Sequence, residues 1–182
     1  MSASTQLPIV LVGDKPAQSI VATPTEELAV ILGQSFEAGI IFTLATNGEK
    51  YISFEVSAGA PTIELQTRIF KADLPTVDLQ ILWGVGITGG TTIPIFNNRR
   101  STTITSVVSF KEDPTVDLTN AILREEDFIP AGTNNNKSSG QIGNNNAHRL
   151  YAPLETFVVK ITNKNQKVNR IKLGYAWLET IL

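Results

Sequence analysis

Hydrophobic and polar residues alternate along most of the chain after residue 36. The alternation is clearest over residues 51–56, 63–69, 77–83, 157–161 and 171–177. Successive side chains of a β-strand point to opposite faces, so a period of two predicts strands with one face in a core. Turn signals such as Gly89-Gly90 and Asp113-Pro114 separate these segments. Seven or eight such strands predict an all-β fold, an antiparallel β-sandwich of jelly-roll type.

Two details of this pattern make residue-level predictions. Over residues 63–69, the alternation places Ile63, Leu65, Thr67 and Ile69 on one face and Arg68 on the other. Asn47-Gly48, between two apolar segments, favours a tight hairpin turn.

The first 32 residues follow a different pattern. Thr23-Pro24-Thr25-Glu26 has the residues of a helix start with a capping box, and TEELAVIL then continues to Gly33, a natural helix stop. We therefore divide the chain into an N-terminal arm with one short helix, residues 1–32, and a β-sandwich domain, residues 33–182.

The arm contains a short apolar segment that cannot be stable alone in water. Its apolar residues are Leu7, Ile9, Val10, Leu11 and Val12. An isolated strand needs a partner sheet. Strand addition to a neighbouring protomer or to a partner protein would satisfy the segment, as would pairing with the chain's own sheet.

Composition limits the classes of partner. Charged residues make up 18% of the chain and the net charge is −2, so we expect no nucleic-acid binding, which needs a dense basic cluster. The chain has no cysteine and hence no disulfide or thiolate metal site. We expect no membrane span, because no stretch approaches about 20 apolar residues, and no signal peptide, because the N-terminus lacks the pattern of one. The neutral polar surface suits either protein contact or an ordinary all-β domain.

Candidate catalytic groups are sparse. His148 is the only histidine, and no Gly-x-Ser-x-Gly motif accompanies it. Glu112-Asp113 and Glu125-Glu126-Asp127 are the acidic clusters, and neighbouring carboxylates on a turn usually point into solvent. A glycosidase would need two carboxylates facing each other across a cleft. We therefore expect no enzyme activity, no cofactor and no metal.

Other polar or aromatic features have a structural and a functional interpretation. The glycine-rich residues 84–90 precede a strand pattern, so they predict a turn and not a phosphate-binding loop. Trp83 and Trp177 lie in register with apolar faces, which favours core positions over a sugar platform. Residues 130–149 are polar and long, and we expect a functional or mobile loop there.

Four segments of the chain contain a series of short motifs: GQSFEAGIIFTLATNGEKYISFEVSAG (33–59), FNNRRSTTITSVVSFKEDPTV (96–116), FIPAG (128–132) and LYAPLETFVVKITNKNQKVNRIKLGYAWLE (150–179). Together these segments resemble a group of tailed-phage virion proteins. The chain departs from that group where Phe157 replaces a tyrosine and where Ala176-Trp177-Leu178-Glu179 replaces Trp-Tyr-Glu.

The resemblance implies a capsid decoration (cement) or head-fibre protein, all-β and homotrimeric, on the outside of the virion. Its partner would be the major capsid protein, and it would be made in the host cytoplasm. The arm residues would then contact the capsid or a neighbouring protomer. Asn97, Asn98, Arg99 and Arg100 would form an architectural corner, in which asparagine tolerates a left-handed turn and Arg100 pairs with Asp113 or Glu112 of a neighbour. The alternative is a carbohydrate- or receptor-binding module that uses the 130–149 loop and a tryptophan.

Overall fold

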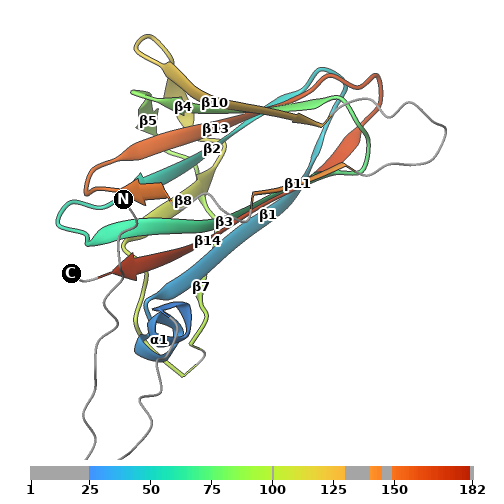
Figure 1. Cartoon of the computed structure of the whole chain (residues 1–182). Coiled ribbons are helices and arrows are strands. Elements are labelled where there is room, and N and C mark those ends of the chain that lie inside the picture. The colour runs from blue at the N-terminus through green and yellow to red at the C-terminus, as the bar shows by residue number, and fades with distance from the viewer. Residues whose placement is uncertain (1–24, 100, 130–139, 145–148, 181–182) are drawn as a thin grey trace, which may run out of the picture.

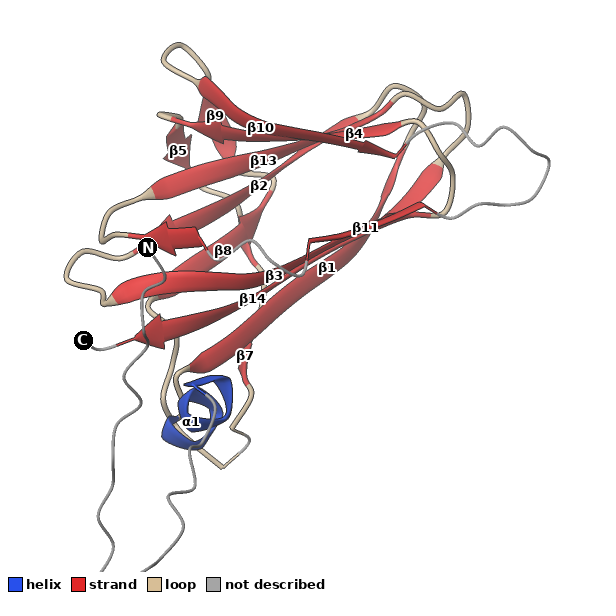
Figure 2. Ribbon diagram, in the orientation of Figure 1, coloured by secondary structure: helices blue, strands red, loops and turns tan. Residues whose placement is uncertain are grey.

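The computed structural model describes residues 25–99, 101–129, 140–144 and 149–180. Two antiparallel sheets pack face to face, and the described residues include a single short helix at one end, so the predicted all-β sandwich is confirmed (Figures 1 and 2). The Leu7–Val12 segment, Arg100 and His148 lie outside the described residues.

Each sheet contains six strands. The first, sheet A, has the order β11 (Gly140–Asn144), β3 (Thr62–Ala72), β14 (Asn169–Thr180), β1 (Ser35–Leu44) and β7 (Ile95–Asn97), and β12 (Arg149–Tyr151) also pairs with β3. The second, sheet B, has the order β10 (Ile122–Ile129), β4 (Val77–Trp83), β13 (Thr156–Asn163), β2 (Glu49–Val56), β8 (Val108–Glu112) and β6 (Thr91–Thr92). A separate two-stranded ribbon joins β5 (Gly86–Thr88) to β9 (Thr115–Asp117).

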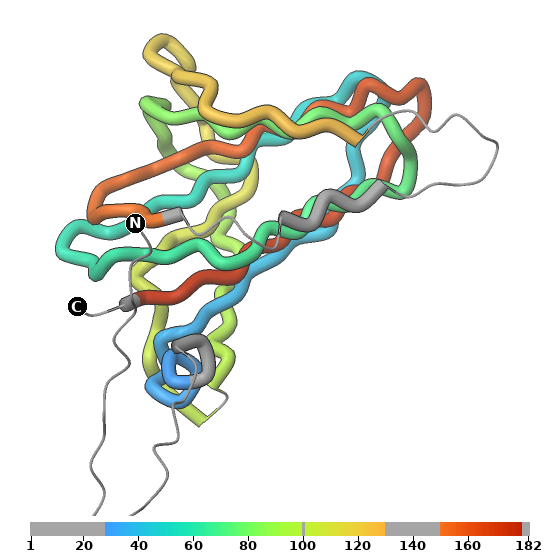
Figure 3. Tube along the Cα trace, viewed as in Figure 1, coloured from blue at the N-terminus to red at the C-terminus, as the bar shows by residue number. Residues whose placement is uncertain are grey.

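The strand pairings are nested, as in a jelly roll. β1 pairs with β14, β2 with β13, β3 with β11 and β4 with β10. Figure 3 shows the result directly, because the blue start of the sandwich lies beside its red end. The strands β1 to β4 therefore alternate between the two sheets, as do β6 to β8, and the chain crosses between the sheets at the turns that join them.

The alternation predicted most of the interior correctly. Phe54 forms the centre of an aromatic cluster that includes Phe110, Phe157, Tyr175 and Trp177, with ring centroids 4.8–6.4 Å from its own. Burying rings of this size supplies a large part of the hydrophobic stabilisation of a sandwich this small.

The predicted face of β3 is wrong in its second half. Ile63 and Leu65 are buried as expected, but the pairing with β14 shifts by one residue between Ala176 and Trp177. Leu65 and Thr67 of β3 are the partners there, so Gln66 is an extra residue in the ladder. A bulge of this kind exchanges inward and outward positions beyond it. Arg68 consequently lies inside the sandwich.

The Asn47-Gly48 hairpin is also wrong, although the turn exists. Asn47 has φ 55° and Gly48 N–H donates to Ala45 C=O, as in a tight turn. The strands on either side pair with β14 and β13 and not with each other. The turn therefore connects the two sheets, because a short turn signal specifies a reversal but not which strand becomes the partner.

The predicted helix forms as α1 (Thr25–Leu32) and ends where expected. Gly33 has φ 72°, its N–H donates to Val30 C=O, and Gln34 N–H donates to Ala29 C=O. This is a Schellman motif, which needs the left-handed backbone that glycine adopts without strain.

Part of the predicted 130–149 loop is strand. Residues 140–144 form β11 on the edge of β3, and β12 begins at Arg149. Main-chain hydrogen bonds can hold an edge strand that is mostly polar, so the polarity of this stretch did not exclude pairing. The glycine-rich residues 84–90, predicted as a turn, instead contain the short strand β5, with Gly84 before it and Gly89 and Gly90 after it at positive φ.

Candidate functional site

The Asn-Asn-Arg corner after β7 holds α1 against the sandwich. Asn97 Nδ2 donates to Gly33 C=O at 2.8 Å and to Ile104 C=O at 3.2 Å. Arg99 Nη1 donates to Ile31 C=O at 2.6 Å, so two side chains satisfy carbonyls at the end of the helix. A cation at a helix C-terminus also complements the helix dipole.

Neither Asn97 nor Asn98 has the left-handed backbone that was expected at this corner. Among described non-glycine residues, positive φ occurs only at Asn47, Thr76, Asp113 and Leu154. Asn97 acts instead through its amide, whose Oδ1 also accepts from Arg99 N–H at 2.8 Å. Side-chain bonding to nearby backbone is the other reason that asparagine is common at turns.

The buried carboxylate of Glu179 anchors the loop that follows the corner. It accepts hydrogen bonds from Ser106 Oγ, from Val107 N–H at 3.1 Å and from Trp177 Nε1 at 3.1 Å. A buried carboxylate is tolerated only with such partners. Corner, loop, helix and β14 thus form one connected end of the sandwich (Figure 1).

Asp113 has a partner within its own chain. Lys50 Nζ lies 2.5 Å from Asp113 Oδ2 and 3.1 Å from Glu112 Oε2. Burial would lower the pKa of Lys50, but both carboxylates outweigh that effect and raise it. The predicted contact between Arg100 and a neighbour's Asp113 stays a prediction.

The Glu125–Asp127 cluster does not lie on a turn, contrary to expectation. It belongs to β10, where Glu125 and Asp127 point toward the interior and only Glu126 is exposed. Arg68 Nη2 is 2.7 Å from Glu125 Oε1 and also contacts Asp127 Oδ2. The two carboxylates therefore share one guanidinium.

The two tryptophans have different environments. Trp177 is fully buried and stacks on Phe36 at 6.2 Å, which confirms its predicted core position. Trp83 is half-buried, stacks on Tyr151 at 5.7 Å and has Arg124 over its ring at 5.5 Å.

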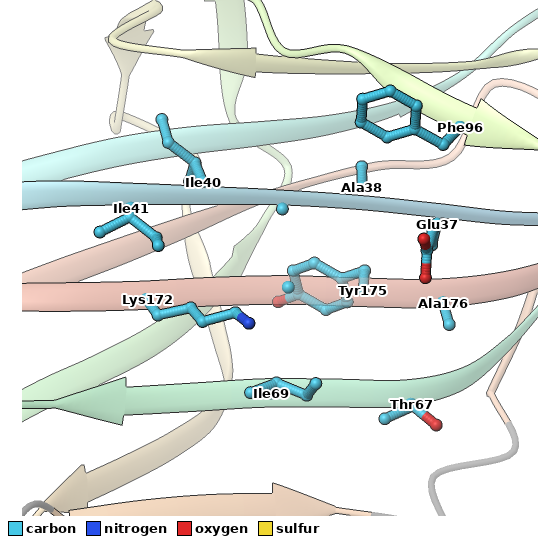
Figure 4. Close-up of a pocket in the computed structure, with 12 residues that line it drawn as sticks. Glu37, Ala38, Ile40, Ile41, Thr67, Ile69, Phe96, Lys172, Tyr175 and Ala176 are labelled. Carbon is cyan, nitrogen blue, oxygen red and sulfur yellow. The ribbon is translucent and has the colours of Figure 1, made fainter.

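A shallow groove crosses the outer face of sheet A (Figure 4). Gly39 of β1 and Gly174 of β14 are paired in the sheet. Two adjacent positions therefore lack side chains, and they form the floor of the groove. Ile41 and Lys172 form one side, and Phe96 with Glu37 the other. The groove encloses about 320 Å³.

The bulge in β3 extends this groove. It turns Thr67 and Ile69 outward, and both line the groove beside Ala176. Phe96 is 61% exposed and also lines a second hollow against Arg99 and the 102–105 segment. An exposed aromatic ring beside apolar strand positions is a surface suited to another molecule.

Sequence reasoning missed the groove, although one signal was present. Glycine inside a strand often marks a close approach of another backbone or ligand, and Gly39 and Gly174 both interrupt alternating segments. Their alignment depends on the β1–β14 register, which no local pattern predicts.

The described residues contain no group of three or more His, Cys, Asp or Glu side chains that could hold a metal ion, and none of their helices has the length and hydropathy needed to cross a membrane.

Comparisons with known proteins give no relative from which to transfer a function. No protein-family model, no curated protein and no solved structure matches this chain.

Proposed function

We propose that this chain is a structural virion protein of a tailed phage, a decoration protein that binds the outside of the major capsid shell and stabilises it. The segment resemblances support this role, and the jelly roll is compatible with it because capsid and lectin domains share that fold. A fold alone does not decide function. The observation that carries the proposal is the groove on sheet A, with Phe96 at its rim.

The groove face suits adhesion to another protein. Its apolar members, Phe96, Ile41 and Ile69, surround a glycine floor that lets a neighbouring backbone or side chain approach closely. Glu37 and Lys172 are its only charged members and are opposite in sign. Little charge would have to be desolvated on contact, which favours binding.

The proposed mechanism needs no chemical step. A ligand that binds only the assembled shell stabilises it by mass action, because the shell must lose the ligand before it opens. A trimer placed across neighbouring coat subunits would bind through three contacts together and leave slowly. Cyclic symmetry would close such an assembly. Glu125 and Asp127 are compatible with a role without chemistry, since both carboxylates bind the guanidinium of Arg68.

Co-sedimentation with capsids tests the proposal. The full chain is mixed with expanded shells assembled from the coat protein encoded in the same genome, and separately with unassembled coat protein. We expect pelleting with the shells and a higher shell melting temperature. Failure to bind shells, together with specific binding on a glycan array, would establish the carbohydrate-binding alternative instead.

Two exposed phenylalanines provide a matched pair of variants. Phe96 and Phe128 are each 61% exposed, but Phe96 lies at the groove and Phe128 lies on β10 of the other sheet. We expect F96S to weaken shell binding at least tenfold and F128S to leave it unchanged. Equal effects would show that the groove is not the contact surface.

The mass of the protein in solution tests the trimer separately. One chain has a mass of 19.7 kDa, so sedimentation equilibrium should give a species about three times heavier. A monomer that still pellets with shells would remove the trimer from the proposal and leave capsid binding in place.

A further inference from the structure

The outer edge of β1 is paired along only part of its length. β7 covers Phe36, Glu37 and Ala38, whereas β1 continues to Leu44. The next pair in the β1–β7 register would be Gly39 with Pro94. Proline has no N–H to donate, so it cannot complete a hydrogen-bonded pair with Gly39. The chain leaves sheet A at this point and has already joined the other sheet at Ile93, whose N–H donates to Phe110 C=O at 2.8 Å. No described strand covers Gly39–Leu44 on this side.

The direction of the backbone groups on this edge follows from two hydrogen bonds. Glu179 N–H donates to Gln34 C=O on the β14 side, and Asn98 N–H donates to Ser35 C=O on the β7 side. These directions alternate along a strand. Gly39, Ile41 and Thr43 therefore direct their N–H and C=O groups to the open edge, and no described residue supplies them with a backbone partner there.

The side chains at this edge are apolar on both faces of the sheet. Ile41 points outward and is 54% exposed. Ile40 and Phe42 point inward and pack against the core, but they are only partly buried. An added strand would cover both faces only if consecutive residues of that strand were all apolar.

We propose that residues 7–12 of the same chain occupy this edge as an antiparallel strand. The segment reads Leu-Pro-Ile-Val-Leu-Val and carries no polar side chain. Its six residues equal in number the six of the open edge from Gly39 to Leu44, and with Pro8 opposite Leu44 five of them lie against that edge. Strand addition gives affinity through main-chain hydrogen bonds and specificity through side chains.

Pro8 determines which segment residues bond to β1. Because it has no N–H, it must lie opposite an even-numbered β1 residue, whose backbone groups point away from the edge. If Pro8 lies opposite Leu44, residues 9–12 lie opposite Thr43 to Ile40 and do not reach Gly39, where Pro94 stands. Ile9 then pairs with Thr43 and Leu11 with Ile41.

The same register matches side chains on each face. Val10 and Val12 point inward and cover Phe42 and Ile40, the two partly buried residues at the margin of the core. Leu11 lies beside the exposed Ile41 on the outer face. A shift of one residue would place Pro8 where an N–H is required, so the parity of the pairing is strongly specified.

The tether favours the chain's own segment over that of a second copy. The 12 residues from 13 to 24 join the segment to α1 and span up to roughly 40 Å when extended. The 10 residues of β1 are about 33 Å long at strand spacing. The segment can therefore reach the edge, and a short tether supplies an effective concentration of about millimolar. Only a concentrated second copy would compete.

This inference does not depend on capsid binding, because the segment and its receiving edge belong to one chain. A covered edge would also prevent sheet-to-sheet association between molecules, since exposed apolar edges are sites of aggregation.

Cysteine pairs in the otherwise cysteine-free full chain test the register. Residues directly opposite in a hydrogen-bonded antiparallel pair have Cα atoms about 5.5 Å apart, which suits a disulfide. L11C with I41C should form an intramolecular disulfide under mild oxidation. The control, V10C with I41C, places the two sulfurs on opposite faces and should react at least tenfold more slowly.

The products distinguish the possible occupants of the edge. A cross-linked monomer from the first pair alone supports the proposal. Cross-linked dimers or trimers would assign the segment to a second copy, and no cross-link, or equal cross-linking of both pairs, would overturn docking in this register.

Hydrogen exchange provides a second readout on the uncross-linked protein. The N–H of Ile41 should be protected in the wild-type chain and exchange at least tenfold faster in V10D/V12D. The N–H of Ile40, which faces β14, should be unchanged. An Ile41 N–H that exchanges freely in the wild type would contradict the proposal.

Discussion

Arg68 on β3 and Asp127 on β10 form an ion pair that joins the two sheets through the interior of the sandwich. Glu125 Oε1 accepts from the same guanidinium nitrogen at 2.7 Å. Only 3% of Arg68 is exposed, so its charge is removed from water and depends on these two partners. Burial would lower the pKa of Arg68, but Tyr175 and the two carboxylates outweigh it and raise it.

Removing the arginine should be costly. R68M leaves the two carboxylates in a largely desolvated position without the cation that they bind in the wild type. Breaking a buried pair in this way costs about 3–5 kcal/mol, so we expect a marked fall in the urea midpoint of unfolding.

A triple variant separates the charge effect from packing. R68M combined with E125L and D127L removes all three charges and should recover most of the loss, because apolar replacement of a whole buried network is often neutral. If the triple variant were less stable than R68M, the ion pair would not be the cause.

Tyr175 should make stability depend on alkaline pH. Burial raises the pKa of its hydroxyl well above the usual value, and the nearby Arg68 offsets only part of that effect. Since the folded pKa exceeds the unfolded value of about 10, the stability is fully present below pH 10 and declines as pH rises above it. When wild type and Y175F are unfolded in parallel from pH 8 to 11, the difference between their free energies of unfolding should stay constant up to pH 10 and change in favour of Y175F above it.

The same substitution has a second expected effect at neutral pH. The Tyr175 hydroxyl is buried and has no hydrogen-bond partner in the structure. Leaving such a group unsatisfied costs about 1–3 kcal/mol, so Y175F should be at least as stable as wild type at pH 7. A clear loss of stability there would show that the hydroxyl has a partner, such as a bound water.

The sequence predicted those strands whose alternation continues without interruption. Phe157, Val159 and Ile161 are all fully buried, as their spacing indicated. β3 was predicted only as far as Leu65, because Thr67 and Ile69 continue the pattern while the chain bulges at Gln66. The position of Arg68 depends on carboxylates 57 and 59 residues away, and a local pattern carries no information about them.

The candidate site was less predictable than the fold. The corner after β7 was identified from its asparagines, but the carbonyls that Asn97 binds belong to a helix end 64 residues earlier. The groove requires Gly39 to meet Gly174, and only the β1–β14 register brings them together. A site that combines residues of different strands depends on which strands pair and in which register. The pattern within one strand does not specify either.

Asn97 should matter more to stability than its neighbour. N97A loses the donors to Gly33 C=O and Ile104 C=O and the acceptor for Arg99 N–H, at about 1 kcal/mol for each net hydrogen bond. N98A loses one side-chain bond, to Ser35 Oγ. Thermal melting should rank wild type above N98A and N98A above N97A, and the reverse order would contradict the role of Asn97 in holding α1.

The two groove glycines separate binding from folding. A Cβ on Gly174 would meet its nearest atoms at 3.6 and 3.8 Å, ordinary contact distances, whereas a Cβ on Gly39 would lie 3.2 Å from Leu173 C=O. G174A should therefore fold normally, with a gain of up to about 1 kcal/mol from a less flexible unfolded chain. G39A should lose about 1 kcal/mol of stability, the lower end of the cost of overpacking.

G174A should also weaken binding to the shell. The added methyl raises the floor of the groove, and we expect shell affinity to fall about tenfold, or 1.4 kcal/mol. Co-sedimentation and melting of the same preparations measure both effects, and unchanged shell binding by a normally folded G174A would exclude the groove as the contact surface.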